Sequence, residues 1–335
     1  MASLREIKDH IGSVRSTLKI TSAMKLVSSA KLRKAQQAVE TMRPYQQELE
    51  RMLAAVNSLN DNSLQNVLSA DSGKGLSVKS WESDTYLLHG KLAIVAIASN
   101  SSLCGAFNGN VVRKVQKLVA KAGGPDRVEV FALGRKVAEP LRKSGVIADP
   151  DRQSLNALVA HPDYAASQAL ASILVEGFDS GRYSGVLLVY NHFVSTSSQK
   201  VVVESFLGAA AGFENSPRGS SSFGLTPPST SVDGPPATDP RVIRPSGGDL
   251  YPGEYLLEPG REAILESLEP QVIRLKLYAA ILDSVAAEHA ARMIAMQSAT
   301  DNAEDLLAEL SLEYNKGRQA KITAEILDLV AGARQ

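Results

Sequence analysis

The sequence predicts a mixed α/β fold in which two long terminal helices pair as a coiled coil beside a central α/β domain. Apolar residues follow an alternating four-and-three spacing over both terminal segments, which is typical of helices that pack along a common seam. Between these segments, short apolar runs alternate with stretches of helical spacing. That alternation indicates a parallel sheet with covering helices.

The N-terminal segment, residues 1–57, is expected to form a helix about 80 Å long at 1.5 Å per residue. Apolar residues also stand beside the polar members of its seam, at Ile20, Met24 and Val27, which we interpret as a drift of the apolar stripe around the helix. Pro44 is expected to kink or interrupt the helix. The predicted seam comprises Ile7, Ile11, Val14, Leu18, Thr21, Lys25, Ser28, Leu32, Ala35, Val39, Met42, Gln46, Leu49, Leu53 and Val56.

The middle of the chain divides into three parts. Residues 58–86 are polar and contain Gly73 and Gly75, so a loop is expected. Residues 87–208 are expected to form the central α/β domain, with strands at KLAIVAIAS, RVEVFALG and GVLLVYNHF and an edge strand added through a hairpin at SQKVVVESFLG. Residues 209–253 hold an insertion rich in Ser, Pro and Gly, which predicts a flexible segment.

Residues 254–335 are expected to form an extended segment followed by the long C-terminal helix, with an early kink at Pro270. No further proline follows, and Gly317 is the only glycine before Gly332. A helix of about 60 residues, roughly 90 Å long, is therefore expected, with His289 among the polar members of its seam. The apolar members are Leu268, Val272, Leu275, Ala279, Leu282, Ala286, Met293, Met296, Ala303, Leu307, Leu310 and Tyr314.

Both terminal stretches carry a resemblance to a known family. IKDHIGSVRSTLKITSAMKLVSSAKLRK and AARMIAMQSATDNAEDLLAELSLEYNKGRQAKIT make the chain similar to the gamma subunit of ATP synthase, the central shaft of a rotary motor. The resemblance implies an α/β fold class, with a long antiparallel coiled coil of the N- and C-terminal helices plus a central Rossmann-like α/β domain. It also implies three alpha and three beta subunits around the coiled coil, and the epsilon subunit and the membrane c ring at the central domain.

The same resemblance implies residues that contact these partners. In the segment YNKGRQAKIT, Arg318, Gln319 and Thr323 match polar positions with which the family contacts loops of the surrounding ring. Met24 and Lys25 stand at the matching place in the family's ITxAM segment. These five residues are therefore expected to touch the alpha and beta subunits.

Charge is balanced over the whole chain but not along its N-terminal helix. Lys and Arg total 36, and Asp and Glu total 36, so net charge does not argue for binding of nucleic acid or a membrane surface. Between residues 10 and 43, however, the chain contains many basic residues and only one acidic residue, Glu40. This favours an acidic counter-surface, although a solvated helix face would show the same pattern. We expect Lys25, Arg33 and Lys34 to face acidic loops of the ring.

Motifs for catalysis, nucleotide phosphates and metals are missing from the sequence. There is no GxxxxGK[ST], and the glycines of SNSSLCGAFNGN do not have the spacing of GxGxxG. Cys104 is the only cysteine, which excludes an internal disulfide and favours a small buried residue over a nucleophile. We therefore expect no catalytic, cofactor-binding or metal-binding residues. Asn100, Ser101 and Ser102 replace the Asp-Arg-Gly that the gamma family usually carries, so the family's ion pair at this place need not form.

Three classes of function fit the pattern: a rotor shaft, a static coiled-coil scaffold that links two partners, and an enzyme built on the α/β domain. The missing motifs disfavour the enzyme, whereas periodicity does not separate shaft from scaffold. The resemblance favours a non-catalytic rotating subunit that transmits torque in a proton-translocating ATP synthase. The sequence begins without a secretory signal, and its longest apolar run, Leu92–Ala98, is too short to cross a bilayer. A peripheral subunit at the cytoplasmic face of the bacterial inner membrane is therefore expected.

Overall fold

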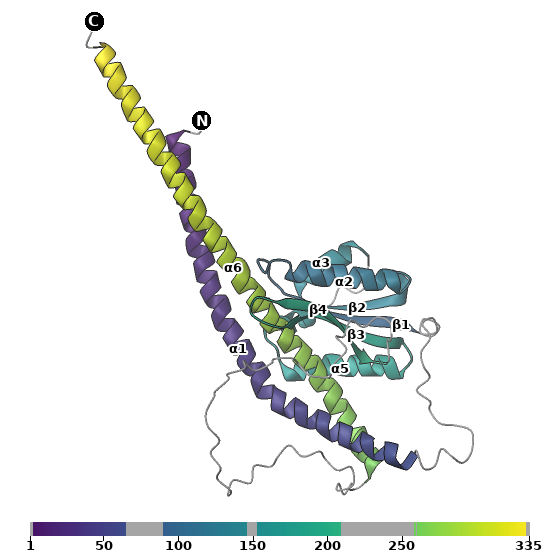
Figure 1. The fold of residues 1–335 in the computed structure, drawn as a ribbon. Helices are drawn as coiled ribbons and strands as arrows, with labels where there is room; N and C mark the ends of the chain where they lie inside the picture. The colour runs from purple at the N-terminus through teal and green to yellow at the C-terminus, as the bar shows by residue number, and fades with distance from the viewer. Residues whose placement is uncertain (1–2, 65–89, 146–152, 209–257, 259, 333–335) are drawn as a thin grey trace, which may run out of the picture.

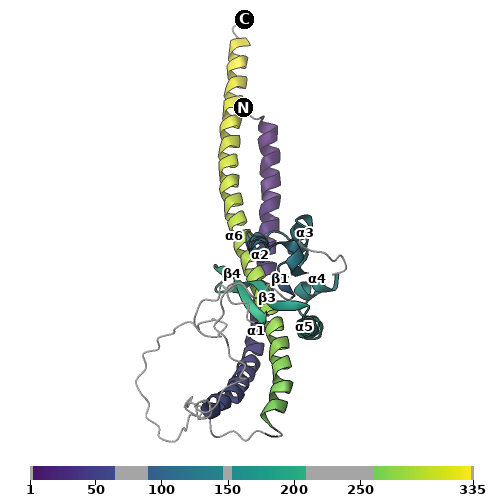
Figure 2. The same ribbon diagram turned by 90° about the vertical axis from the view of Figure 1, so that its right-hand side faces the viewer.

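Two long helices and a small sheet domain make up the computed structural model, which describes residues 3–64, 90–145, 153–208, 258 and 260–332. Helix α1 spans Leu4–Leu64 and helix α6 spans Arg261–Gly332. They lie side by side and run in opposite directions, so that both termini lie at the same end of a rod (Figures 1 and 2). The expected α/β fold class with an antiparallel coiled coil is confirmed.

Helix α1 begins at a reciprocal capping pair and ends later than expected. The Ser3 amide donates to the Glu6 carboxylate (2.9 Å), and the Glu6 amide donates to the Ser3 hydroxyl (3.3 Å), which satisfies amides that the helix leaves free at its start. The helix ends at Leu64 and not at residue 57, so the predicted loop is wrong for its first residues, which contain no Gly or Pro to stop a helix. The rest of that loop lies outside the described residues.

Pro44 does not interrupt α1, because the helix continues through it for five further turns. The helix does change direction in the half that contains Pro44 (Figures 1 and 2). Proline lacks one backbone hydrogen bond and crowds the preceding turn, which accounts for a bend without a break.

The predicted seam of α1 is buried or half-buried along its whole length, including its polar members. The interpretation of a drifting stripe is wrong. Thr21 and Ser28 are buried on the seam, whereas Ile20 and Val27 are 59% and 55% exposed. Small hydroxyl side chains fit the seam because they bond the preceding turn of their own helix, as Ser28 does with the Met24 carbonyl at 2.8 Å.

The sheet domain contains four strands in the order β2-β1-β3-β4. Strands β1 (Lys91–Ile97), β2 (Val128–Leu133) and β3 (Tyr183–Phe193) are parallel, and β4 (Gln199–Leu207) joins β3 through the expected antiparallel hairpin. Successive residues of β1 belong to different cores, with Ala93, Val95 and Ile97 on one face and Leu92, Ile94 and Ala96 on the other. Both faces of the sheet are therefore covered.

Helices α2 (Phe107–Lys121) and α3 (Arg135–Lys143) cover one face of the sheet. The short helix η2 (Pro125–Arg127) connects α2 to β2. On the other face lie α4 (Gln153–Ala160), α5 (Tyr164–Asp179) and the rod. Helix α6 is buried on all sides from Ala279 to Glu288, because α1 covers one side of it and the sheet domain the other.

Helix α6 begins at Arg261, within the range 254–335 that was expected to contain it, and continues through Pro270. All the predicted apolar seam positions of α6 are buried or half-buried. The Ser/Pro/Gly-rich insertion, residues 209–253, and the extended segment that precedes α6 lie outside the described residues apart from residues 258 and 260.

Candidate partner-binding surfaces on the rod

The seam between α1 and α6 contains a buried polar pair as well as apolar contacts. The hydroxyl of Thr300 lies 3.0 Å from the hydroxyl of Thr21 and 2.8 Å from the Met296 carbonyl oxygen. The Thr21 hydroxyl donates to the Leu18 carbonyl at 3.1 Å. A polar pair inside an apolar seam favours one register of the two helices, because a shifted register would leave these hydroxyls facing apolar side chains.

Opposite the seam, α1 presents an exposed surface that we call the outer face. It combines apolar and basic side chains, and Leu26 is 70% exposed there. Among the described residues, no carboxylate lies within ion-pair distance of Arg33 or Lys34. The outer face therefore offers apolar area and uncompensated positive charge together. Its members are Lys19, Ile20, Ala23, Leu26, Val27, Ala30, Arg33 and Lys34.

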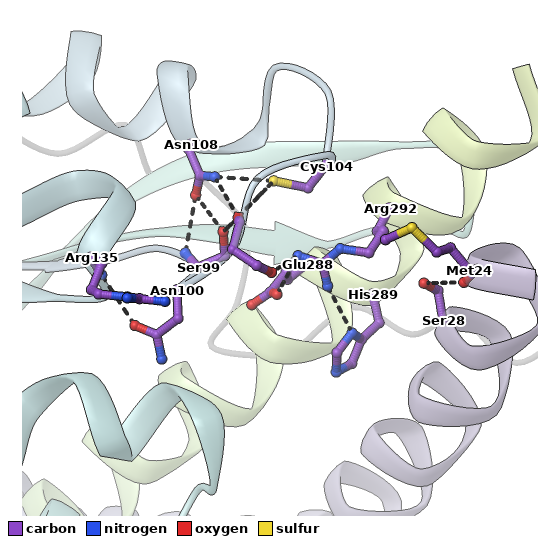
Figure 3. A network of polar contacts seen from close by, with 11 residues as sticks. Met24, Ser28, Ser99, Asn100, Cys104, Asn108, Arg135, Glu288, His289 and Arg292 are labelled. Atoms are coloured by element: carbon purple, nitrogen blue, oxygen red, sulfur yellow. Dashed lines mark hydrogen bonds and ion pairs between the residues drawn. The ribbon is translucent and has the colours of Figure 1, made fainter. Parts of the chain in front are cut away.

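The predicted contact residues of α1 do not all share this face. Arg33 and Lys34 are exposed on it, whereas Met24 and Lys25 are half-buried at the edge of the seam. Figure 3 shows the Met24 side chain pointing from α1 towards Arg292 of α6. Met24 and Lys25 can therefore offer a partner only part of their surface.

Sequence reasoning missed Leu26, and it named Ile20 and Val27 only as signs of a drifting stripe. The available signal was a second set of apolar residues beside an already complete seam. Exposed apolar side chains that gather on one face commonly mark a binding surface.

The C-terminal end of α6 projects beyond the start of α1 (Figure 1). A Cβ atom added at Gly317 would lie 2.9 Å from Cδ2 of Leu4, so Gly317 marks the last close contact with α1. Residues 318–332, which we call the tip, continue as a single helix. Its exposed apolar side chains are Ile322, Ile326, Leu327 and Leu329.

Arg318, Gln319 and Thr323 lie together at the base of the tip and are all exposed. The Thr323 hydroxyl donates to the Gln319 carbonyl at 2.9 Å, which leaves its oxygen lone pairs available to a partner. These residues are roughly 30 Å along the rod from the outer face of α1, counting about 20 residues of α6 at 1.5 Å each. The structure thus places the predicted contact residues in two separate groups.

Behind the outer face, a polar network ties α6 to the loop that follows β1 (Figure 3). Arg292 pairs with Glu288 at 2.8 Å and donates to the Ser101 hydroxyl at 2.6 Å. Asn100 accepts from the Arg135 amide at 3.1 Å and donates to the Asn156 carbonyl at 2.7 Å. Neutral side chains at positions 100 and 101 therefore make specific contacts inside the molecule.

Two titratable groups of this network are shifted by their surroundings. Burial raises the pKa of Glu288, and the neighbouring Arg292 opposes that rise. Burial, assisted by the positive charges of Arg292 and Lys31, lowers the pKa of His289 to about 4. His289 therefore stays neutral near pH 7, as suits a histidine on the seam.

Cys104 is a small buried residue, as expected, and the side-chain amide of Asn108 donates to its sulfur at 3.1 Å. Gly105 has a φ of +58° in the turn before α2, and the neighbouring Leu103 also has a positive φ, +67°. In the described part of the chain, no three His, Cys, Asp or Glu side chains are arranged to hold a metal ion. None of the described helices has the length and apolar character that a membrane crossing requires.

Known proteins similar to this chain extend over its full length. A family model described as ATP synthase matches residues 3–334. A protein named ATP synthase gamma chain from Bacteroides thetaiotaomicron is 39% identical over 337 residues, which cover 100% of both chains. Another of that name, from Flavobacterium psychrophilum, is 39% identical and covers 99% of this chain and 98% of its own.

One similar solved structure is a chain of the Tetrahymena thermophila mitochondrial ATP synthase, from the structure of its central stalk and c ring. Its TM-score to this chain is 0.48, and the sequence identity is 19%. The match covers 84% of this chain and 99% of that one.

Proposed function

This chain belongs to the ATP synthase gamma chain family, and we propose that it is the rotating central stalk of a proton-translocating ATP synthase. As a gamma chain it is a non-catalytic subunit, and its contribution to ATP synthesis is mechanical. The rod lies inside a ring of three alpha and three beta subunits, and the sheet domain contacts the epsilon subunit and the membrane c ring.

The observation that carries this proposal is the asymmetry of the rod. One side presents the apolar and basic outer face of α1, and one end consists of the single helix of the tip. Each of three equivalent catalytic sites around such a rod meets a different surface at any moment. Rotation then changes which conformation each site favours, because a contact shifts an equilibrium by its difference in free energy between the two states.

The required energy is set by the size of that shift. Moving a site from 1:99 to 99:1 between two conformations takes about 5.5 kcal/mol of differential contact energy. Exposed ion pairs contribute about 0.2–1 kcal/mol each, so Arg33 and Lys34 alone are insufficient. The apolar members of the outer face, Ile20, Leu26 and Val27, supply area that a ring subunit can bury in one orientation and release in another.

We further propose that Arg318, Gln319 and Thr323 contact ring loops from the base of the tip. We also propose that Lys25, Arg33 and Lys34 face acidic loops at the open end of the ring, and that Met24 contacts the ring beside them. The exposure of the tip residues supports the first placement, and the uncompensated charge of Arg33 and Lys34 on the outer face supports the second. We assign the assembled complex to the cytoplasmic face of a bacterial inner membrane, since the relatives described above are bacterial chains.

A rotation assay on the assembled complex tests the proposal. Ile173 on α5 is 54% exposed whereas Cys104 is buried, so an Ile173→Cys variant gives the sheet domain an accessible thiol to which a bead can be attached. With the ring fixed to a surface, ATP should drive the bead round in one direction. A bead that stays still while the complex hydrolyses ATP would favour the alternative, a static coiled-coil scaffold.

A further inference from the structure

Helix α6 carries two opposite charges against the sheet domain. Lys276 and Asp283 are seven residues apart, which is about two turns, so they lie on the same side of the helix. Between them, Leu277, Ala280 and Ile281 are fully buried in the core that α6 shares with β3. Apolar burial is not directional and does not by itself fix a helix in one position on a sheet. The two charged residues add directional contacts.

Asp283 contacts the end of strand β3 through both of its carboxylate oxygens. Its Oδ2 lies 2.7 Å from Nδ1 of His192, and its Oδ1 accepts from the Phe193 amide at 3.2 Å. Strand β1 pairs with β3 only as far as Val189, so the last residues of β3 have no β1 neighbour. A buried amide needs an acceptor, and Asp283, whose side chain is only 5% exposed, supplies it.

Lys276 contacts the neighbouring strand β4. Its Nζ lies 3.0 Å from Oε1 of Glu204 and donates to the Ser205 carbonyl at 2.8 Å. The Tyr190 hydroxyl donates to the other oxygen of Glu204 at 3.0 Å. Burial raises the pKa of Tyr190, and the nearby carboxylates add to this, so the tyrosine stays protonated and remains a donor.

The order of charges specifies where α6 sits on the sheet. Negative Asp283 faces His192, and positive Lys276 faces negative Glu204. A slip of α6 by two turns in one direction would bring Lys276 to the place of Asp283, opposite His192. Such a like-charge contact disfavours the shifted arrangement, and this is how charged pairs commonly set register.

The surroundings of His192 favour its protonated form. The hydrogen bond to Asp283 raises the pKa of His192, while partial burial and the charge of Lys200 on β4 oppose the rise and Glu204 assists it. Burial raises the pKa of Asp283, and the bonds from His192 and Phe193 oppose that rise. The charged pair therefore exists only while His192 is protonated and Asp283 is ionised, and it is lost as the pH rises through the folded-state pKa of His192.

We propose that Asp283 and His192 form a latch that fastens the sheet domain to the shaft helix α6, so that the turning shaft carries the sheet domain with it, and that the latch weakens when His192 loses its proton. This inference rests on the proposed rotary function. Asp283 acts here as a positioning residue, because its side chain is buried between α6 and β3 and holds the sheet domain through His192 and Phe193.

The first test is hydrogen exchange at the Phe193 amide in the assembled complex. Relative to the intrinsic exchange rate, protection should fall by about tenfold or more in Asp283→Asn, which replaces a charged acceptor by a neutral one. In the unchanged chain, protection should also fall between about pH 6 and about pH 9, and His192→Gln should abolish this pH dependence. A purely structural role for Asp283 would not produce the pH step.

The second test compares ATP-driven proton pumping with ATP hydrolysis in the same complexes. Asp283→Asn should lower the ratio of pumping to hydrolysis while hydrolysis by the ring continues. Glu129→Gln is a matched control, because it removes a carboxylate that bonds Arg182 at 2.9 Å within the sheet domain and away from α6. The control should leave the ratio unchanged.

The outcomes separate the two proposals. If the unchanged complex hydrolyses ATP without pumping, the rotary function is wrong. If it pumps, but Asp283→Asn pumps with the same ratio and keeps full protection at Phe193, the latch is wrong while the rotary function stands. A Phe193 protection that is independent of pH in the unchanged chain would overturn the role of the His192 proton.

Discussion

Breaking the Glu288–Arg292 ion pair is the most direct way to test how the network behind the outer face holds α6. The two side chains are only 9% and 10% exposed and lie 2.8 Å apart. Arg292→Met keeps the apolar stem of the side chain but leaves the Glu288 carboxylate buried without its cation. Breaking one partner of a buried pair costs about 3–5 kcal/mol of the free energy of unfolding. The double change Glu288→Leu with Arg292→Met removes both charges and should restore most of that loss.

The cost of Arg292→Met should depend on pH with a known sign. Burial raises the pKa of Glu288, and Arg292 opposes the rise, so the variant carboxyl binds its proton more tightly than the native one. A folded-state pKa above the unfolded value destabilises the protein at high pH and not at low pH. The loss should therefore be largest at about pH 8 and smaller at about pH 5.

Urea unfolding of the full chain, followed by circular dichroism at both pH values, measures these effects. The single changes Arg292→Met and Glu288→Leu and their combination form a double-mutant cycle. A loss below about 1 kcal/mol in Arg292→Met, or strictly additive effects in the cycle, would contradict the assignment of a buried, mutually dependent pair.

Three further outcomes are expected. Arg318→Ala and Gln319→Ala should each impair ATPase coupling and assembly of the complex. Because both residues are exposed, each change should alter the free energy of unfolding by less than about 1 kcal/mol. Wild-type coupling in both variants would count against contact at the tip. Reversing the charges of Arg33 and Lys34 to Glu should slow ATP hydrolysis by the complex, most strongly at low salt, and an effect that does not vary with salt would argue against an acidic partner. Because the pKa of His289 is lowered to about 4, stability should fall as the pH drops from about 6.5 towards 4, and His289→Gln should remove that dependence in acid unfolding curves.

The coiled coil could be predicted from the sequence because its signal is periodic and local. Every predicted seam position of α1, from Ile7 to Val56, is buried or half-buried. The error concerned Ile20 and Val27, which were assigned to a drifting seam and are exposed. Apolar character identifies residues that avoid water, but it does not state whether the same chain or another subunit covers them. Thr21 and Thr300 could stay on the seam because each bonds its own helix and the other.

The contacts that join the sheet domain to α6 could not be predicted in this way. His192 and Asp283 are separated by 91 residues and by an insertion, and neither belongs to a motif. Their pairing depends on the extension of β3 beyond the end of β1 and on which side of α6 packs against the sheet. Both are consequences of tertiary packing. The same holds for Arg292 and Ser101, which meet only because the loop after β1 reaches the rod.

The pairing of the first helix with the last also has a consequence for how the chain folds during synthesis. The two hydroxyls that meet in the seam belong to residues 279 positions apart. At ordinary translation rates of about 5–20 residues per second, α1 leaves the ribosome tens of seconds before its partner helix exists. The sheet domain can complete its strands within that interval, whereas the apolar seam of α1 stays uncovered. Chains that terminate before α6 should therefore aggregate, and contacts of such high sequence separation should make formation of the rod the slow final step of folding.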